Sequence, residues 1–100
     1  MLIVAGSIIT EPGERDVFLA AVQPMVTATL DEPGCHEYSF TPDQRDDNRI
    51  MLYELWDDQD ALNGHFASAH MAEWRKVSET LKTVSADIKK YIISEVGTLP

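Results

Sequence analysis

Residues 2–10, LIVAGSIIT, are apolar at odd and even positions alike, and this pattern constrains the fold more than any other in the sequence. Successive side chains of a β-strand point to opposite faces of the sheet. The apolar side chains therefore divide between the faces, with Leu2, Val4 and Ile8 on one and Ile3, Ala5 and Ile9 on the other. Residues 48–56, NRIMLYELW, repeat the pattern. Strands of this kind are usually covered on both faces, so we expect a sheet with two covers.

A helix is predicted over residues 14–31, and it begins within the turn sequence EPGERD at 11–16. Apolar residues recur there at steps of three and four, the spacing of one helical face. Pro24 interrupts this pattern, so we expect it to kink the helix or split it into two pieces. The turn signal DEPG at 31–34 then leads into a strand over residues 35–41, CHEYSFT.

A second helical region is predicted from about 58 to 82, after a polar hairpin loop at 42–48 and the strand at 48–56. Asp57 or Asp58 is a suitable N-cap for it. We expect a break near residues 67–69, where Ser68 caps a second segment. Residues 87–96, DIKKYIISEV, are predicted as the last strand.

This order, β-α-β-β-α-β, predicts an α+β ferredoxin-like fold, a four-stranded antiparallel sheet with its helices on one face. We interpret residues 1–100 as one domain. Helices on one face leave the other face of the sheet open, although its strands are apolar there as well. We therefore predict a homodimer in which a second copy covers the open face.

The composition narrows the possible partners. Eight Lys and Arg residues against seventeen Asp and Glu give a net charge of −9, which repels phosphate backbones and anionic lipids. We expect no nucleic-acid partner and no membrane partner. Cys35 is the only cysteine, so no internal disulfide can form. The apolar start is too short for a membrane span and lacks a basic segment before it, and we expect a cytoplasmic protein.

His65 and His70 raise the question of a metal site. Five residues turn a continuous helix by about 500°, which leaves the two side chains roughly 140° apart. A break at Ser68 would bring them closer, but no third ligand has a recognisable spacing. We therefore predict no metal site. Glycine-rich phosphate or dinucleotide motifs are absent, so we predict no bound cofactor.

Two further features have both a structural and a functional interpretation. Phe66, His70 and Trp74 follow each other at four-residue steps, a stripe that suits either a core or the wall of a pocket for a flat ligand. Glu54 is the single charge on the strand face that it shares with Trp56. A buried carboxylate needs a partner or a raised pKa, so Glu54 either binds a backbone N–H or an Arg, or belongs to a functional site.

Three fragments resemble the antibiotic biosynthesis monooxygenase (ABM) domain family: EPGC at 32–35, YELWDDQDAL at 53–62 and HFASAH at 65–70. The resemblance extends over essentially the whole chain. It implies a dimeric α+β barrel, in agreement with the dimer predicted from the strand pattern. Members that are enzymes include cofactor-independent oxygenases of aromatic polyketides and quinols.

The resemblance implies that a small aromatic molecule and dioxygen are the partners. His65 carries over best as the catalytic base, with Glu54 as its orienter or as a second polar anchor. Trp56, Phe66, His70 and Trp74 are the candidate substrate-binding residues. The haem-degrading relatives have an Asn on the first strand where this chain offers Ser7, so we expect no haem degradation.

Two alternatives remain open. Some relatives are isomerases of phosphorylated signalling metabolites, and an anionic ligand would require Arg45, Arg49 or Arg75, all in contexts that indicate exposure to solvent. The domain is also compatible with a non-catalytic, ligand-binding or stress-associated dimer, because a fold does not determine a function.

Overall fold

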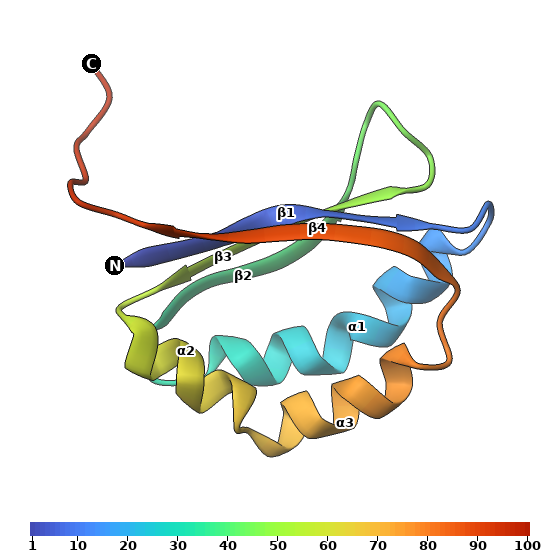
Figure 1. Ribbon diagram of the computed structural model, residues 1–100, viewed down its shortest axis with the longest axis horizontal. Helices are drawn as coiled ribbons and strands as arrows, with labels where there is room; N and C mark the ends of the chain where they lie inside the picture. Colours follow the sequence, from blue (N-terminus) through green and yellow to red (C-terminus); the bar gives the residue numbers. More distant parts are fainter.

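The computed structural model describes residues 1–100, and its elements follow the order β-α-β-β-α-α-β. They are β1 (Leu2–Thr10), α1 (Arg15–Leu30), β2 (Cys35–Pro42), β3 (Arg49–Trp56), α2 (Gln59–Phe66), α3 (Ala69–Ser78) and β4 (Thr83–Ile92). The strands form one four-stranded antiparallel sheet in the order β2-β3-β1-β4. All three helices lie on one face of this sheet (Figure 1). The predicted ferredoxin-like fold is confirmed.

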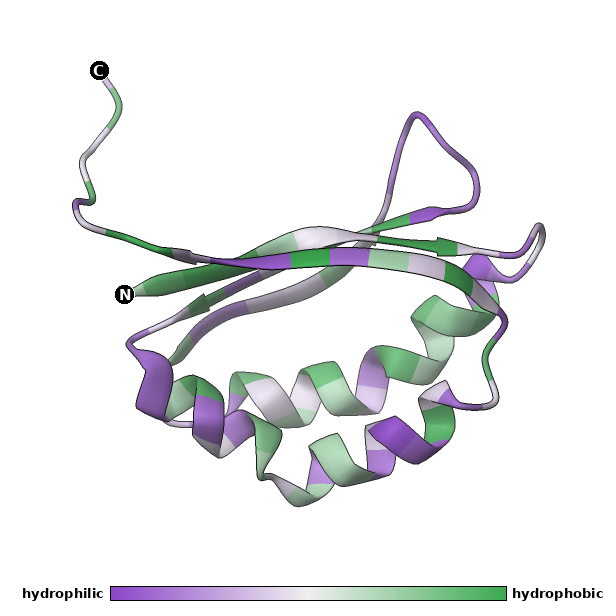
Figure 2. Ribbon diagram, viewed as in Figure 1, coloured by the Kyte–Doolittle hydropathy of each residue, from purple (hydrophilic) through white to green (hydrophobic).

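The core lies between the helices and one face of the sheet. Strand pairing places Leu2 opposite Trp56 and Ile8 opposite Ile50, so these four side chains share the face toward the helices. All four are buried. The same face receives the apolar stripe of α1, and Figure 2 shows hydrophobic residues along both β1 and α1. In the two central strands, β1 and β3, successive side chains point to opposite faces of the sheet, and this alternation determines which of them enter the core.

Helix α1 continues through Pro24 as a single element, so the predicted split is wrong. Proline has no N–H to donate to the carbonyl one turn earlier, which belongs to Ala20. Both Pro24 and Ala20 are exposed, so water can satisfy that carbonyl without disturbing the buried side of the helix.

The second helical region divides where the sequence predicts it. The Asp58 side chain accepts a hydrogen bond from the Ala61 N–H at 2.9 Å and begins α2. The Ser68 hydroxyl accepts one from the Met71 N–H at 3.2 Å and begins α3. Each cap satisfies a backbone donor that a helix start leaves free. Both predicted caps are confirmed.

Strand β4 begins and ends four residues earlier than predicted, at Thr83 and Ile92 instead of 87 and 96. Its extent is set by its partner β1, because Leu2 pairs with Ile92 and Thr10 with Thr83. Beyond these pairs, the Ile93 N–H still donates to the Met1 carbonyl at 3.1 Å, and the strand ends before it. The apolar residues of the sequence alone do not reveal this limit.

The other face of the sheet is uncovered in the single chain. Pairing places Ile3, Met51, Tyr53 and Leu55 on it, and the Tyr53 side chain is 39% exposed. Every residue of β4 is exposed. Covering of this face by a second copy stays a prediction. None of the helices has the length and apolar character needed to cross a membrane.

Gly6 permits the close approach of β1 and β4, and its replacement by Ala tests this packing. A Cβ there would lie 2.0 Å from the Asp87 carbonyl oxygen and 2.7 Å from the Ile88 Cα. Because backbone atoms must move, we expect Gly6→Ala to lower the free energy of unfolding by about 1–3 kcal/mol in urea denaturation. The matched control is Gly64→Ala in α2, where a Cβ would meet nothing within 4 Å. That change should stabilise by up to about 1 kcal/mol, and equal effects at both positions would contradict this account.

Candidate functional site

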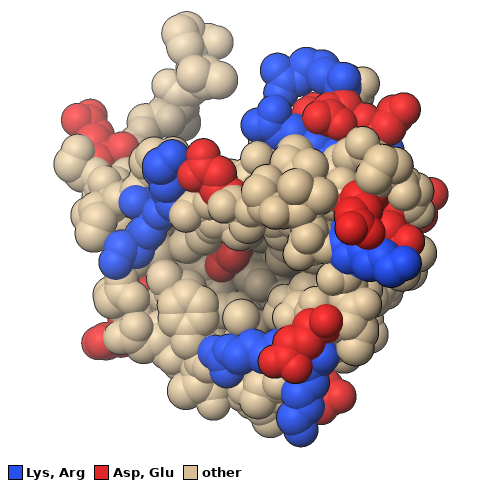
Figure 3. Space-filling model, turned by 45° about the vertical axis from the view of Figure 1, so that its right-hand side comes forward, with Lys and Arg blue, Asp and Glu red and all other residues tan.

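A cavity of about 210 Å³ lies between the sheet and the helices. Its walls come from all four strands and all three helices and are mainly apolar. The lining residues are Val4, Ile8, Phe18, Tyr38, Phe40, Leu52, Glu54, His65, Phe66, Met71, Trp74 and Ile88. Figure 3 shows acidic atoms inside a hollow that uncharged atoms border, and Glu54 is the one acidic residue of this lining. An apolar cavity with a few polar groups is the usual form of a small-molecule site.

Glu54 presents its carboxyl group to this cavity from β3. Glu54 is only 6% exposed. One of its carboxylate oxygens, Oε1, accepts a hydrogen bond from the Trp56 indole N–H at 2.9 Å. The pKa of Glu54 is raised to about 7, mainly by burial; the hydrogen bond from Trp56 opposes the rise, and the charge of Glu32 contributes to it. A carboxyl group with this pKa exchanges protons near neutral pH, as a general acid or base must.

A hydrogen-bonded chain of Glu32, His65 and Tyr38 forms a second polar part of the site. His65 is 1% exposed; its Nδ1 lies 2.7 Å from Glu32 Oε2, and its Nε2 lies 3.3 Å from the Tyr38 hydroxyl. In the neutral imidazole, Nδ1–H donates a hydrogen bond to the Glu32 carboxylate, so Nε2 accepts a hydrogen bond from the Tyr38 hydroxyl. Burial lowers the pKa of His65, although the hydrogen bond to Glu32 opposes this. Burial raises the pKa of Tyr38 above its usual range, and the nearby Glu54 charge adds to the rise.

His70 approaches the same carboxylate from α3. Its Nε2 lies 3.2 Å from Glu32 Oε2, and its side chain is 25% exposed. The angle expected for a continuous helix does not apply, because the chain breaks at Ser68 between the two histidines. One ligand atom each from Glu32, His65 and His70 therefore lies within 4.8 Å of the others.

The structure distributes the candidate residues among different places. His65, Glu54, Phe66 and Trp74 border the central cavity. Trp56 is fully buried and does not border it; its indole supports Glu54 from within the core. His70 instead borders a groove of about 330 Å³, together with residues of α1 and α3.

The orienter of His65 is Glu32, whereas the sequence had suggested Glu54. Glu32 stands in the turn between α1 and β2, far from His65 in the sequence, so no spacing rule connects the two. Tyr38 was also missed, although strand alternation gives a signal. Tyr38 pairs directly with Glu54 across β2 and β3, so both side chains share the helix-covered face.

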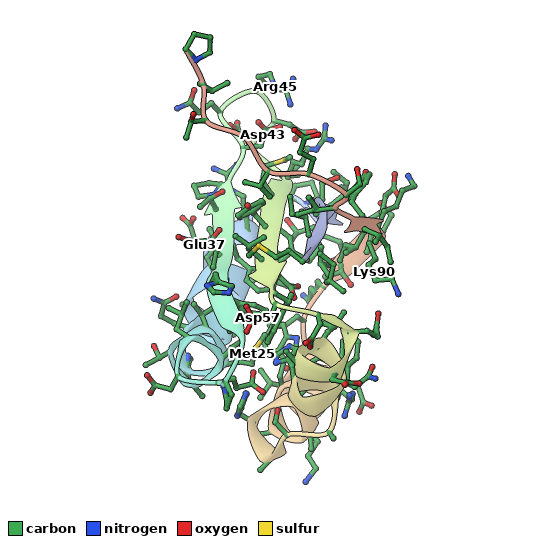
Figure 4. The ribbon with its side chains drawn as sticks, turned by 90° about the vertical axis from the view of Figure 1, so that its left-hand side faces the viewer. Met25, Glu37, Asp43, Arg45, Asp57 and Lys90 are labelled. Carbon is green, nitrogen blue, oxygen red and sulfur yellow. The ribbon has the colours of Figure 1, made fainter.

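The three arginines considered for an anionic ligand lie outside the cavity. Arg45 and Arg49 both contact Asp43 in and beside the β2–β3 loop, and Figure 4 shows Arg45 and Asp43 at that end of the sheet, away from the helices. The Arg75 guanidinium donates to the Phe66 carbonyl at 2.8 Å. The cavity lining includes no Lys or Arg.

The raised pKa of Glu54 has a consequence for stability. From its ordinary value of 4.5 up to about 7, the folded chain retains a proton that the unfolded chain has released, so stability falls as pH rises through this range. We expect Glu54→Gln, which cannot ionise, to be more stable than the native chain at pH 8 by up to about 3 kcal/mol, and the advantage to shrink toward pH 5. Urea denaturation across this range measures it. An advantage that does not change with pH would show that Glu54 titrates normally.

Comparison with known proteins identifies the family. The sequence pattern of the antibiotic biosynthesis monooxygenase family matches residues 1–77. The uncharacterised protein sll1783 of Synechocystis is 36% identical over 98 residues, which span 98% of this chain and 67% of that protein. YcnE of Bacillus subtilis, a candidate monooxygenase, is 24% identical over 95 residues, which span 95% of this chain and 100% of YcnE.

Solved structures agree in fold. A candidate antibiotic biosynthesis monooxygenase from Deinococcus radiodurans superposes with a TM-score of 0.88 at 20% identity, covering 100% of this chain and 99% of that one. Rv0793 from Mycobacterium tuberculosis gives a TM-score of 0.83 at 23% identity, covering 97% and 98% of the two chains. At these identities the structural likeness concerns the fold alone, whereas the sequence match extends over most of the chain. This chain belongs to the antibiotic biosynthesis monooxygenase family.

Proposed function

We propose that this protein is a cofactor-independent monooxygenase that oxidises a small phenolic or quinol-like aromatic molecule with dioxygen. The observation that carries the proposal is Glu54, a carboxyl group with a pKa of about 7 in the wall of an apolar cavity. Membership of the monooxygenase family supports the reaction type.

The chemistry requires a base and an apolar site. Removal of the phenolic proton gives an electron-rich anion, which passes one electron to dioxygen. The resulting substrate radical and superoxide join at a ring carbon that bears hydrogen, and the peroxide takes up a proton. Loss of water from this hydroperoxide leaves a carbonyl at that carbon. One oxygen atom of dioxygen enters the product and the other leaves as water, so no external reductant is needed.

Glu54 is the group that we assign as the base. It borders the cavity and has a pKa close to the working pH, whereas both ring nitrogens of His65 already have partners. His65 then acts as a positioning residue that fixes the orientation of the Tyr38 side chain in the cavity wall. Phe66 and Trp74 supply flat walls for an aromatic ring.

The size of the cavity restricts the substrate. At about 210 Å³ it is smaller than the roughly 300–1,000 Å³ usual for drug-sized ligands. We therefore propose a substrate with one or two rings. An aromatic polyketide with four fused rings would need the helices to move away from the sheet.

We also propose that the protein acts as a homodimer joined through the open face of its sheet. Ile3, Met51, Tyr53 and Leu55 form an apolar surface there, which water would otherwise cover. The catalytic cavity lies on the opposite face, so dimerisation leaves it within each chain.

Oxygen uptake tests the proposed reaction. With hydroquinones and naphthols as substrates, and with metal and flavin removed, we expect turnover above the uncatalysed rate. Glu54→Gln should lower the turnover number by a factor on the order of 10²–10⁴, the usual contribution of a general base. Glu79→Gln, at an exposed carboxylate at the end of α3, is the matched control and should leave the rate unchanged.

The pH profile separates a base from a structural role. The native rate should rise with pH through about 7 as Glu54 loses its proton, and Glu54→Gln should lack this limb. The ionisable groups near Glu54 are Tyr38, Cys35, Glu32 and His65, and Lys90 lies on the same sheet face two strands away. Helices α1 and α3 contribute apolar side chains to the cavity. If no substrate gives oxygen uptake but aromatic ligands bind in thermal shift, the proposed oxidation is contradicted. This result would favour a ligand-binding dimer.

Sedimentation tests the dimer independently of turnover. We expect the native chain to have twice the 11.2 kDa mass of one chain. Met51→Lys on the open face should produce monomers, because a charge there cannot be paired in an apolar interface. Val17→Lys on the exposed side of α1 is the control and should remain dimeric. A native monomer, or a dimer that survives Met51→Lys, would contradict the proposed interface.

A further inference from the structure

Three side chains from three separate segments converge beside the junction of α2 and α3. Glu32 comes from the turn before β2, His65 from α2 and His70 from α3. Glu32 Oε2 lies 2.7 Å from His65 Nδ1 and 3.2 Å from His70 Nε2. One ligand atom from each residue lies within 4.8 Å of the other two. A single carboxylate oxygen thus stands between two imidazole nitrogens.

The hydrogen bonds within this cluster do not satisfy all of its atoms. His70 Nε2 is buried from solvent and makes no well-formed hydrogen bond, although it lies close to Glu32. A buried polar atom without a partner costs free energy. A cation bound among the three side chains would accept a lone pair from each of them, including this one.

The donor set is one that transition metals use. Two imidazoles and one carboxylate form the protein part of many zinc sites and of the facial sites of non-haem iron. Ligand atoms about 2.1 Å from a zinc ion lie about 3.4 Å apart at a tetrahedral angle. The pair formed by His70 and Glu32 is already close to this separation, and the pair formed by His65 and Glu32 needs to open by only about 0.7 Å.

The surroundings of His65 suit a metal ligand. Its second ring nitrogen lies 3.3 Å from the Tyr38 hydroxyl, the kind of partner that fixes the orientation of a ligating imidazole. The Ser68 cap fixes the break that brings His70 to the same place. Arg75 is a nearby positive charge that opposes a cation, but its guanidinium is bonded to the Phe66 carbonyl, and the chain carries a net charge of −9.

We propose that Glu32, His65 and His70 form a binding site for one divalent transition-metal ion per chain, with zinc as the best match to the donor set. The His70 side chain is partly exposed and borders the groove beside α1 and α3, so the ion would enter from that side. The site shares Glu32 and His65 with the hydrogen-bonded chain that holds Tyr38. The oxidation is tested with metal removed and metal binding is tested without substrate, so failure of either proposal leaves the other open to its own test.

Metal titration of the full chain tests this site. After treatment with a chelator and dialysis, Zn²⁺ binding is measured by calorimetry and Co²⁺ binding by visible absorption, in which imidazole ligation at low coordination number gives intense bands. We expect one ion per chain. His70→Ala should weaken binding at least tenfold and remove the Co²⁺ bands. His36→Ala is the matched control, because His36 is the one other histidine and lies on the exposed part of β2 beside Asp57.

Two variants of the proposed ligands, His70→Ala and Glu32→Gln, test the metal site together. His70 is partly exposed, so His70→Ala should fold, and circular dichroism checks this. Glu32→Gln keeps the shape of the side chain and should also weaken Zn²⁺ binding. Loss of binding in both variants and its retention in His36→Ala supports the site. Absence of Zn²⁺ binding to the native chain would overturn the proposal, as would equal binding by the native chain and His70→Ala, or loss of binding only in His36→Ala.

Discussion

The burial of one carboxyl group on the otherwise apolar inner face of β3 is the constraint on which the rest of the site depends. Glu54 shares this face with Trp56, whose indole N–H also needs a partner because the side chain is fully buried. The two residues are two apart on β3, so the strand places both on one side and the indole donates to the carboxylate at 2.9 Å. This bond satisfies one oxygen. The rest of the carboxyl group faces the cavity. The pKa of Glu54 is raised mainly because the group is buried.

A second network ties together segments that are far apart in the sequence. The His65 imidazole is buried between the Glu32 carboxylate and the Tyr38 hydroxyl, so it joins the turn before β2, the strand β2 and the helix α2. The break at Ser68 allows His70 to approach the same carboxylate. Glu32 therefore takes part in both the hydrogen-bonded chain that holds Tyr38 and the proposed metal site.

The fold could be predicted from the sequence because local patterns determine most of it. Alternation in residues 2–10 and 48–56 identified the core face, and Ser68 was recognisable as a cap. The boundaries of β4 were not, since pairing with β1 sets them. The site was predicted in part: His65 and Glu54 border the cavity as residues of their type in that context suggest. Glu32 and the buried position of Trp56 depend on contacts between distant segments, which no spacing in the sequence encodes.

The Glu54 carboxyl group in the cavity is expected to exchange its proton near neutral pH. Carbon NMR of the protein labelled at glutamate side-chain carboxyl carbons, with Glu54→Gln used to assign the resonance, measures this directly. We expect the Glu54 signal to titrate with a midpoint at about 7, well apart from the signals of the exposed glutamates. A midpoint near the ordinary value of 4.5 would show that the carboxyl group is solvated, and would contradict the role of Glu54 as the base of this cavity.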